Sequence, residues 1–165
     1  MRTFFITDKE EIDQIIQECD VCFVGINEED GSPHVFPMNF AWHNGDVILH
    51  SGPHGKHLDL IAKDNRACVT FCSDRKLMYQ HPDVACSYSM DSKSVLCKGR
   101  IEFVEAFEEK EKLVKIFMKH YTPREFKISV PAINNVKVWR LRVEEITAKK
   151  FGQNFRSQDF EKTSN

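Results

Sequence analysis

The feature that most constrains the fold of this chain is the dipeptide Asn44-Gly45, which lies between two apolar runs. The first run covers residues 35–42 and the second covers residues 47–49. Both central positions of a two-residue hairpin turn need a positive φ, which Asn and Gly adopt most readily. The sequence therefore predicts antiparallel strands over residues 34–41 and 46–50.

A loop rich in hydrogen-bond donors follows the second of these strands and leads into a short helix. Residues 50–56 are His-Ser-Gly-Pro-His-Gly-Lys, and Leu58, Ile61 and Ala62 lie on one side of a helix expected over residues 56–63. The free N–H groups and the dipole of a helix N-terminus attract anions. We therefore expect the loop and Lys56 to hold a phosphate. The alternative is that Lys56 is a solvated surface lysine.

The rest of the chain predicts a mainly β protein with short peripheral helices. Thr7-Asp8-Lys9-Glu10 has the pattern of a capping box with Thr7 as the N-cap, and Gly99 indicates a bulge or a close approach within a strand. Six or so antiparallel strands in this order favour a closed barrel. Strands are expected over residues 21–26, 66–72, 92–104 and 136–147, helices over 7–19 and 107–121, loops over 73–91 and 131–135, and a polar tail over 151–165.

The bulk properties fit one soluble domain over residues 1–150. The 165 residues carry a formal net charge of -2, which gives no reason to expect binding to nucleic acid or to an acidic membrane surface. No apolar run approaches the roughly 20 residues that span a bilayer. The N-terminus lacks the apolar segment of a signal peptide. We therefore expect a cytoplasmic protein.

The cysteines allow two interpretations. Cys19 and Cys22 have the C-x-x-C spacing of redox or metal sites, but the chain has no second such pair to complete a zinc site. Cys68, Cys72 and Cys97 lie within apolar strand patterns, where cysteine behaves as a small hydrophobic residue. We favour buried, reduced thiols, which suit a reducing compartment.

Five motifs together resemble a known family. They are Gly31-x-Pro33-His34-Val35-x-Pro37, the pentapeptides at 47–51 and 55–59, Asn65 with the Ala-Cys-Val at 67–69, the strand at 94–101, and the strand from 138 to 149. Their order and spacing resemble the split-barrel flavoproteins related to pyridoxamine 5'-phosphate oxidase. Within that family, the chain looks most similar to the Nim-type nitroimidazole-resistance proteins. The resemblance covers roughly residues 7–151.

The resemblance implies a homodimer of split β-barrels that binds FMN, or FAD, in clefts at the dimer interface. It implies that His50 lies beside the flavin, where it would act on a small-molecule substrate; we expect no metal. Residues 37–40 would lie along the isoalloxazine, and Lys56 with the N–H groups around Gly55 would hold the phosphate. The implied cofactor contacts are Pro37, Met38, Asn39, Phe40, His50, Ser51, Gly55, Lys56, His57, Ser94 and Lys149.

The chain departs from the oxidase itself at three places. Uncharged Val35 or Phe36, and Phe40, stand where the oxidase has an arginine and a lysine, and its phosphate clamp is reduced to residues 54–56. The C-terminal Arg-x-His motif of the oxidase is missing. These departures argue against oxidation of pyridoxamine phosphate and favour the Nim-like group, whose members also lack these residues.

Several alternatives stay open at this stage. His50, His54 and His57, with Asp59, have a spacing that could suggest a metal site, although their loop contains Gly and Pro. Lys98 and Arg100 suit either a solvated sheet face or a phosphate contact. For function, we expect a flavin-dependent reductase that passes electrons to a small acceptor such as a nitroaromatic. The alternatives are a flavin- or haem-binding barrel for storage or sensing, and a barrel that has lost its cofactor.

Overall fold

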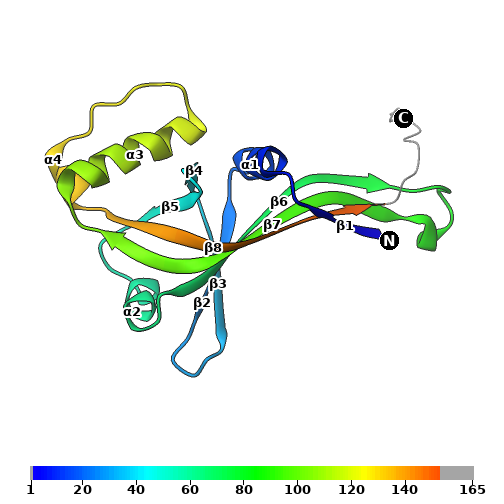
Figure 1. The fold of residues 1–165 in the computed structure, drawn as a ribbon, viewed down its shortest axis with the longest axis horizontal. Coiled ribbons are helices and arrows are strands. Elements are labelled where there is room, and N and C mark those ends of the chain that lie inside the picture. Colours follow the sequence, from blue (N-terminus) through cyan, green and yellow to red (C-terminus); the bar gives the residue numbers. More distant parts are fainter. Residues whose placement is uncertain (1, 153–165) are drawn as a thin grey trace.

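The computed structural model describes residues 2–152 of the chain. They form an eight-stranded sheet with four α-helices and one short 3-10 helix around it (Figure 1). In chain order the elements are β1 (Arg2–Ile6), α1 (Lys9–Gln17), β2 (Cys22–Asn27), β3 (Pro33–Met38), β4 (Ala41–His43), β5 (Asp46–Ser51), α2 (Lys56–Lys63), β6 (Arg66–Met78), η1 (Ala85–Ser87), β7 (Ser89–Val104), α3 (Phe107–Tyr121), α4 (Val130–Asn134) and β8 (Lys137–Gly152).

The sheet is antiparallel throughout, as predicted, but it does not close into the predicted barrel. Its strand order is β3-β2-β6-β7-β8-β5-β4, and β1 pairs with β8. Within residues 2–152, β3 and β4 are the two ends of this ladder and do not pair with each other. The expected meander through the first strands is broken because β5 pairs with β8 instead of β3. The fold is therefore an open, split barrel.

The turn at Asn44-Gly45 forms as predicted. Asn44 has a φ of 53° and Gly45 a φ of 84°, and the flanking residues His43 and Asp46 pair directly. Two consecutive positive φ values are those of a type I′ turn, whose twist matches that of the two strands. This turn defines the β4–β5 hairpin.

The first helix begins one residue later than predicted. Its N-cap is Asp8, not Thr7, because the Asp8 carboxylate accepts the N–H of Glu11 at 2.8 Å. Asp satisfies a free helix N–H as well as Thr does. The helix buries Ile15 and Ile16 against the sheet.

The prediction of a long loop over residues 73–91 is wrong. β6 continues to Met78 and β7 begins at Ser89, so the two strands form a long hairpin arm, on the right in Figure 1. Their register shifts between Ser73 and Lys76, where Asp74 has a φ of 53°. Residues 74–77 of β6 are exposed on both faces, so their sequence lacks the apolar alternation that reveals a half-buried strand.

Two short elements are also missing from the sequence-based expectation. β1 pairs with the end of β8 through register partners such as Ile6 and Ala148. α4 occupies most of the segment that was expected to be a loop, and Pro131 lies in its first turn, where a missing N–H costs nothing. The last strand reaches Gly152, so Phe151 and Gly152 are not tail. The rest of the predicted tail lies outside the described residues.

Gly99 lies at a bulge, as predicted. Lys98 pairs with Glu145 but Gly99 pairs with Val143, which leaves one extra residue on β8. A Cβ added to Gly99 would lie 1.8 Å from the backbone oxygen of Arg142. The glycine is therefore required by the close approach of the two backbones.

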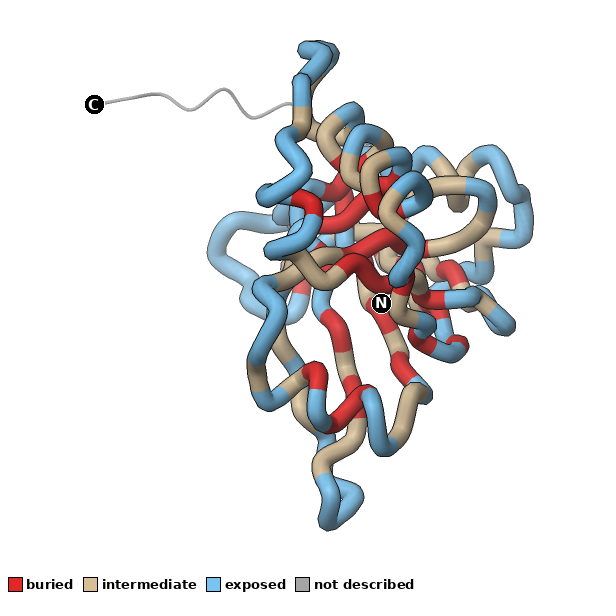
Figure 2. The backbone as a smooth tube through the Cα atoms, turned by 90° about the vertical axis from the view of Figure 1, so that its left-hand side faces the viewer, coloured by how far each residue is buried: buried red, intermediate tan, exposed pale blue. Residues whose placement is uncertain are grey.

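The hydrophobic core has two parts, which β5 separates. Figure 2 shows the buried positions of the chain in red. Val47, Leu49 and Trp139 face the larger part, inside the sheet. Ile48 faces the smaller part, where Leu113 and Phe117 of α3 cover the outer side of β5 and β8. Neighbouring β5 residues thus point to opposite faces, as the period of a strand requires.

All six cysteines are free thiols, but they are not all buried as predicted. Cys19, Cys22 and Cys97 are buried, whereas Cys72 and Cys86 are exposed. Burial raises the pKa of the Cys22 and Cys97 thiols to about 12, so both stay protonated at neutral pH. Cys72 is exposed because its position on β6 faces away from the core.

Candidate functional site

The loop between β5 and α2 builds the N-terminal end of a helix without a side-chain cap. Gly55 is the N-cap residue with a φ of 150°, and no side chain bonds to the first helical N–H groups. A Cβ at Gly55 would lie 2.8 Å from the ring of His57. The glycine therefore leaves backbone donors accessible beside Lys56, an arrangement that suits an anion.

Lys56 is engaged in an ion pair with the turn between β2 and β3. Its Nζ lies 2.6 Å from Oε1 of Glu28, and Nδ1 of His34 lies 3.0 Å from the same oxygen. The sequence analysis missed Glu28, because 28 residues separate it from Lys56 and no local pattern joins them. Lys56, the cation predicted to bind the phosphate, is thus paired with a carboxylate of the same chain.

His57 lies in an aromatic cluster beside the loop. Its ring stacks on Trp139 with centroids 5.3 Å apart and contacts Phe36 at 5.6 Å. The indole N–H of Trp139 donates to Ser51 Oγ at 3.3 Å. Nε2 of His57 is buried and has no hydrogen-bond partner. Burial is the main cause that lowers the pKa of His57, with a contribution from His34, which favours the neutral ring.

His50 lies on the opposite face of β5 from Ser51. Its ring meets Phe117 of α3 edge-on, with centroids 4.4 Å apart. Burial beneath α3 lowers the pKa of His50, so its ring is neutral at pH 7. The structure therefore separates His50 from His57. Within residues 2–152, no three His, Cys, Asp or Glu side chains gather as a metal-binding group.

The segment over residues 37–40 is divided between the two faces of the sheet. Pro37 is exposed on the outer face, while Met38 packs against the core. Asn39 donates from Nδ2 to the carbonyl oxygen of Asp20 at 3.0 Å. The family resemblance implies that each of these residues lies along a ligand, and of the four, Pro37 and Asn39 are exposed.

Phe40 is part of the core and is not exposed to a ligand. Its ring is fully buried and packs against Phe71 and His120, each with centroids 4.7 Å away. Its backbone N–H donates to the hydroxyl of Tyr121 at 2.8 Å, and that hydroxyl donates to Asp20 O at 3.0 Å. The family resemblance implies that Phe40 lies along the isoalloxazine, and the structure shows its ring packed in the core. No local sequence pattern points to Tyr121, which lies 81 residues further along the chain.

Ser94 and Lys149 form a second group, away from the first. They are direct register partners on β7 and β8, and Nζ of Lys149 lies 5.3 Å from the centroid of the Phe5 ring. Val138 is the β8 partner of His50, so eleven residues of β8 (138 to 149) separate the two groups. That corresponds to roughly 36 Å along an extended strand. The predicted site residues thus form two separate groups within one chain.

An uncharged row of side chains crosses five strands on the outer face of the sheet. Register pairs join Pro37 to Phe23, Phe23 to Thr70, Thr70 to Leu96, and Leu96 to Thr147. We call these five residues the outer band. Phe23 is 49% exposed. Ser94 and Lys149 lie two residues further along their strands, hence on the same face.

A charged zone adjoins the outer band. Lys98 pairs with Glu145 across β7 and β8, and Arg100 pairs with Glu144 and with Asn65. These contacts place Lys98 and Arg100 on a solvated sheet face, which was one of the two roles considered for them.

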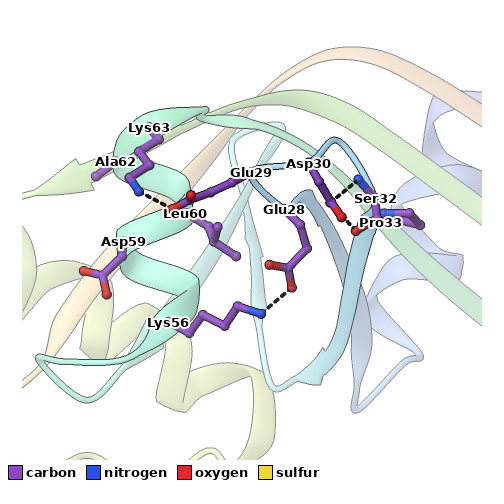
Figure 3. A pocket seen from close by; sticks show the side chains of 10 residues that line it. All are labelled: Glu28, Glu29, Asp30, Ser32, Pro33, Lys56, Asp59, Leu60, Ala62 and Lys63. Atoms are coloured by element: carbon purple, nitrogen blue, oxygen red, sulfur yellow. Dashed lines mark hydrogen bonds and ion pairs between the residues drawn. The ribbon is translucent and has the colours of Figure 1, made fainter.

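The hollow nearest to Lys56 is acidic. It has a volume of about 850 Å³ and lies between α2 and the β2–β3 turn (Figure 3). Four carboxylates and two lysines line it, so its lining has a net negative charge. His57 and Trp139 do not belong to this lining. The lining residues are Glu28, Glu29, Asp30, Ser32, Pro33, Lys56, Asp59, Leu60, Ala62 and Lys63.

The beginning of α2 fits a ligand that carries a phosphate. It offers a helix N-terminus without a side-chain cap, the ammonium of Lys56 and the buried, unpartnered Nε2 of His57. Buried polar atoms are almost always hydrogen-bonded, so an unpartnered one suggests a partner that the chain itself does not supply. A phosphate that binds there competes with the ion pair between Lys56 and Glu28.

None of the helices within residues 2–152 combines the length and apolar character needed to cross a membrane. No curated protein sequence matches the chain. Residues 8–150 match the family model described as pyridoxamine 5'-phosphate oxidase.

Solved structures give the same result. A candidate 5-nitroimidazole antibiotic resistance protein from Bacteroides thetaiotaomicron is 46% identical, with a TM-score of 0.83 over 90% of this chain and 87% of that one. The flavocytochrome Anf3 from Azotobacter vinelandii (20% identity, TM-score 0.78, 90% and 70% covered) shares the fold. So does the FAD and heme binding protein from Mycobacterium smegmatis (14%, 0.75, 98% and 92%). The sequence-based resemblance is confirmed: this chain belongs to the pyridoxamine 5'-phosphate oxidase family.

Proposed function

We propose that the protein is a flavin-dependent oxidoreductase that works as a homodimer and reduces a small acceptor such as a nitroaromatic. The observation that carries this proposal is the beginning of α2, where Gly55 leaves the helix without a side-chain cap beside Lys56. Family membership supports a flavin as the ligand, and the 46% identical relative named for nitroimidazole resistance supports the acceptor. FMN is our first choice, because the site offers one cation for one phosphate.

The residues of the chain bind and orient the cofactor, which supplies the redox chemistry. When bound, a flavin would supply two-electron redox chemistry between a donor such as a reduced nicotinamide and the acceptor. Lys56 and the N–H groups near Gly55 hold the phosphate, and His57 Nε2 donates to the ligand or accepts from it. His50 has a neutral ring, so its contribution is an N–H donor that orients the substrate.

The outer band is the surface that we propose for the second copy. It is uncharged, continuous across five strands and partly exposed, with Phe23 at 49%. Apolar patches of this kind on soluble proteins are commonly interaction sites. A two-fold axis would place the same band on each partner, as in most homodimers.

Dimerisation also accounts for the separation of the predicted cofactor contacts. Ser94 and Lys149 lie beside the outer band, eleven β8 residues away from the partner of His50. In our proposal, Ser94 and Lys149 of one subunit complete the site that begins with Gly55 and Lys56 of the other.

The first experiment is an absorption spectrum of the purified protein, followed by mass spectrometry of the small molecule released on denaturation. We expect a flavin spectrum and the mass of FMN. The mass of FAD would support a flavin cofactor but would show that it is FAD and not FMN. A Soret band would favour the haem-binding alternative. A colourless protein that also fails to bind added FMN would refute a flavin-dependent function.

Turnover is tested separately with a reduced nicotinamide and a nitroaromatic acceptor. We expect the flavin-loaded protein to oxidise the nicotinamide only when an electron acceptor is present. That acceptor is the nitroaromatic or, in its place, oxygen. His50→Ala should keep its flavin and change the turnover rate. A flavin-loaded protein that transfers no electrons under these conditions would support the storage or sensing alternative.

A further inference from the structure

Glu28 occupies the position in which an anion would meet Lys56. One carboxylate oxygen, Oε1, lies 2.6 Å from Nζ of Lys56 (Figure 3). The same oxygen lies 3.0 Å from Nδ1 of His34. The Glu28 side chain is only 21% exposed, whereas that of Lys56 is 64% exposed. The carboxylate is therefore held in place by two partners, and the lysine reaches it from solvent.

The surroundings of Lys56 favour this internal pairing. Lys63, on the same side of α2, pairs with Glu29, the next residue of the β2–β3 turn. Asp30 is bonded by the N–H and hydroxyl of Ser32, and it adds a further negative charge to the hollow. A phosphate that approaches Lys56 therefore meets carboxylates before it meets an unpaired cation.

A phosphate and the Glu28 carboxylate cannot share Lys56 at no cost. Two anions within hydrogen-bond distance of one ammonium repel each other, and the repulsion is larger near the protein surface than in bulk water. The carboxylate must move away, or the phosphate must bind at a greater distance. Either change reduces the affinity for a ligand that carries a phosphate and leaves a ligand without one unaffected.

We propose that Glu28 is a built-in competitor for the cofactor phosphate and sets how strongly the protein prefers phosphorylated flavins. The inference rests on the proposed function, in which a flavin phosphate binds at Gly55 and Lys56. Glu28 acts through Lys56 and does not touch the isoalloxazine. It lowers the affinity for FMN and leaves the affinity for riboflavin, which lacks the phosphate, unchanged.

The test measures Kd for FMN and for riboflavin by equilibrium dialysis of the cofactor-free protein at one fixed ionic strength. Glu28→Gln keeps the shape of the side chain and removes its charge. We expect it to bind FMN about threefold to tenfold more tightly than the wild type, with riboflavin within about twofold, the size expected from the loss of one exposed ion pair and of one nearby repulsion. Glu29→Gln is the matched control, because its partner is Lys63, and we expect it to leave both values within about twofold.

A double-mutant cycle shows whether Glu28 acts through Lys56. Lys56→Ala should weaken FMN binding about tenfold, and adding Glu28→Gln to that variant should then change little. The same gain in both backgrounds would show a general charge effect and overturn the inference. If the wild type binds FMN but Glu28→Gln leaves the ratio of FMN to riboflavin affinity unchanged, the inference alone fails. If neither protein binds FMN, the proposed function fails as well.

Discussion

Removal of one hydroxyl, in Tyr121→Phe, tests how α3 holds the end of β3. The Tyr121 hydroxyl accepts the N–H of Phe40 at 2.8 Å and donates to Asp20 O at 3.0 Å. Burial raises the pKa of this phenol, so the hydroxyl keeps its proton at neutral pH. The substitution leaves the ring in place and removes the hydroxyl with its hydrogen bonds, of which those to Phe40 and Asp20 join α3 to the chain around β3.

The two lost bonds have different costs. The carbonyl oxygen of Asp20 still accepts a hydrogen bond from Nδ2 of Asn39 at 3.0 Å, so the loss of its bond from Tyr121 costs little. The N–H of Phe40 is partly buried and is left without this acceptor, and an unsatisfied buried donor costs about 1–3 kcal/mol. Because this N–H is only partly buried, we expect a loss of about 1–2 kcal/mol in the free energy of unfolding. For a chain of this size that lowers Tm by about 2–8 °C.

The assay is urea unfolding followed by circular dichroism, at one fixed protein concentration because a dimer would make stability depend on concentration. Tyr88→Phe is the matched control: its hydroxyl also donates to a backbone oxygen, that of Pro82 at 2.8 Å, but at an exposed position. We expect the control to lose less than about 0.5 kcal/mol. Equal losses for the two variants, with an unchanged m value, would show that the Tyr121 hydroxyl does not hold Phe40 in place.

Three further predictions concern the outer band, the bulge and acid stability. Phe23→Lys should convert the dimer to a monomer in size-exclusion chromatography with light scattering, whereas Leu77→Lys, exposed but outside the band, should not. Gly99→Ala should lower the free energy of unfolding by about 3 kcal/mol or more, because its Cβ would overlap a backbone oxygen, while Gly52→Ala, with open space around it, should cost less than about 1 kcal/mol. Burial lowers the pKa of His50, so the unfolded chain binds more protons than the folded one. The free energy of unfolding should therefore fall as pH drops below about 6.5. His50→Gln should make that fall smaller, as measured by urea unfolding at pH 5 and pH 7.5.

The sequence predicts best where a local signal decides the structure. The positive φ values of Asn44 and Gly45 fix one hairpin, and the helix from Lys56 begins and ends where its apolar spacing indicates. It predicts worst where two faces of a strand are exposed. Residues 73–76 are polar on both sides, so nothing in their pattern distinguishes a strand of the arm from a loop.

The candidate site depends on contacts that no local pattern contains. The pairing of Lys56 with Glu28 and the bond from Phe40 to Tyr121 join residues 28 and 81 positions apart. One signal, however, was present in the sequence. His50 and Ser51 are neighbours on a predicted strand and must face opposite sides of the sheet, so the two could not both lie against the same face of one ligand.

The open ladder and the divided site lead to one physical consequence if the proposed dimer is correct. A flavin that contacts residues of both subunits binds the dimer more tightly than the monomer. By thermodynamic linkage, it must then strengthen the dimer by the same factor. Glu28 enters this balance on the side of the free protein, because its ion pair with Lys56 exists only until a phosphate replaces it. Affinity for the cofactor and affinity between the subunits are therefore linked, and Glu28 acts on the cofactor side of that linkage through its ion pair with Lys56.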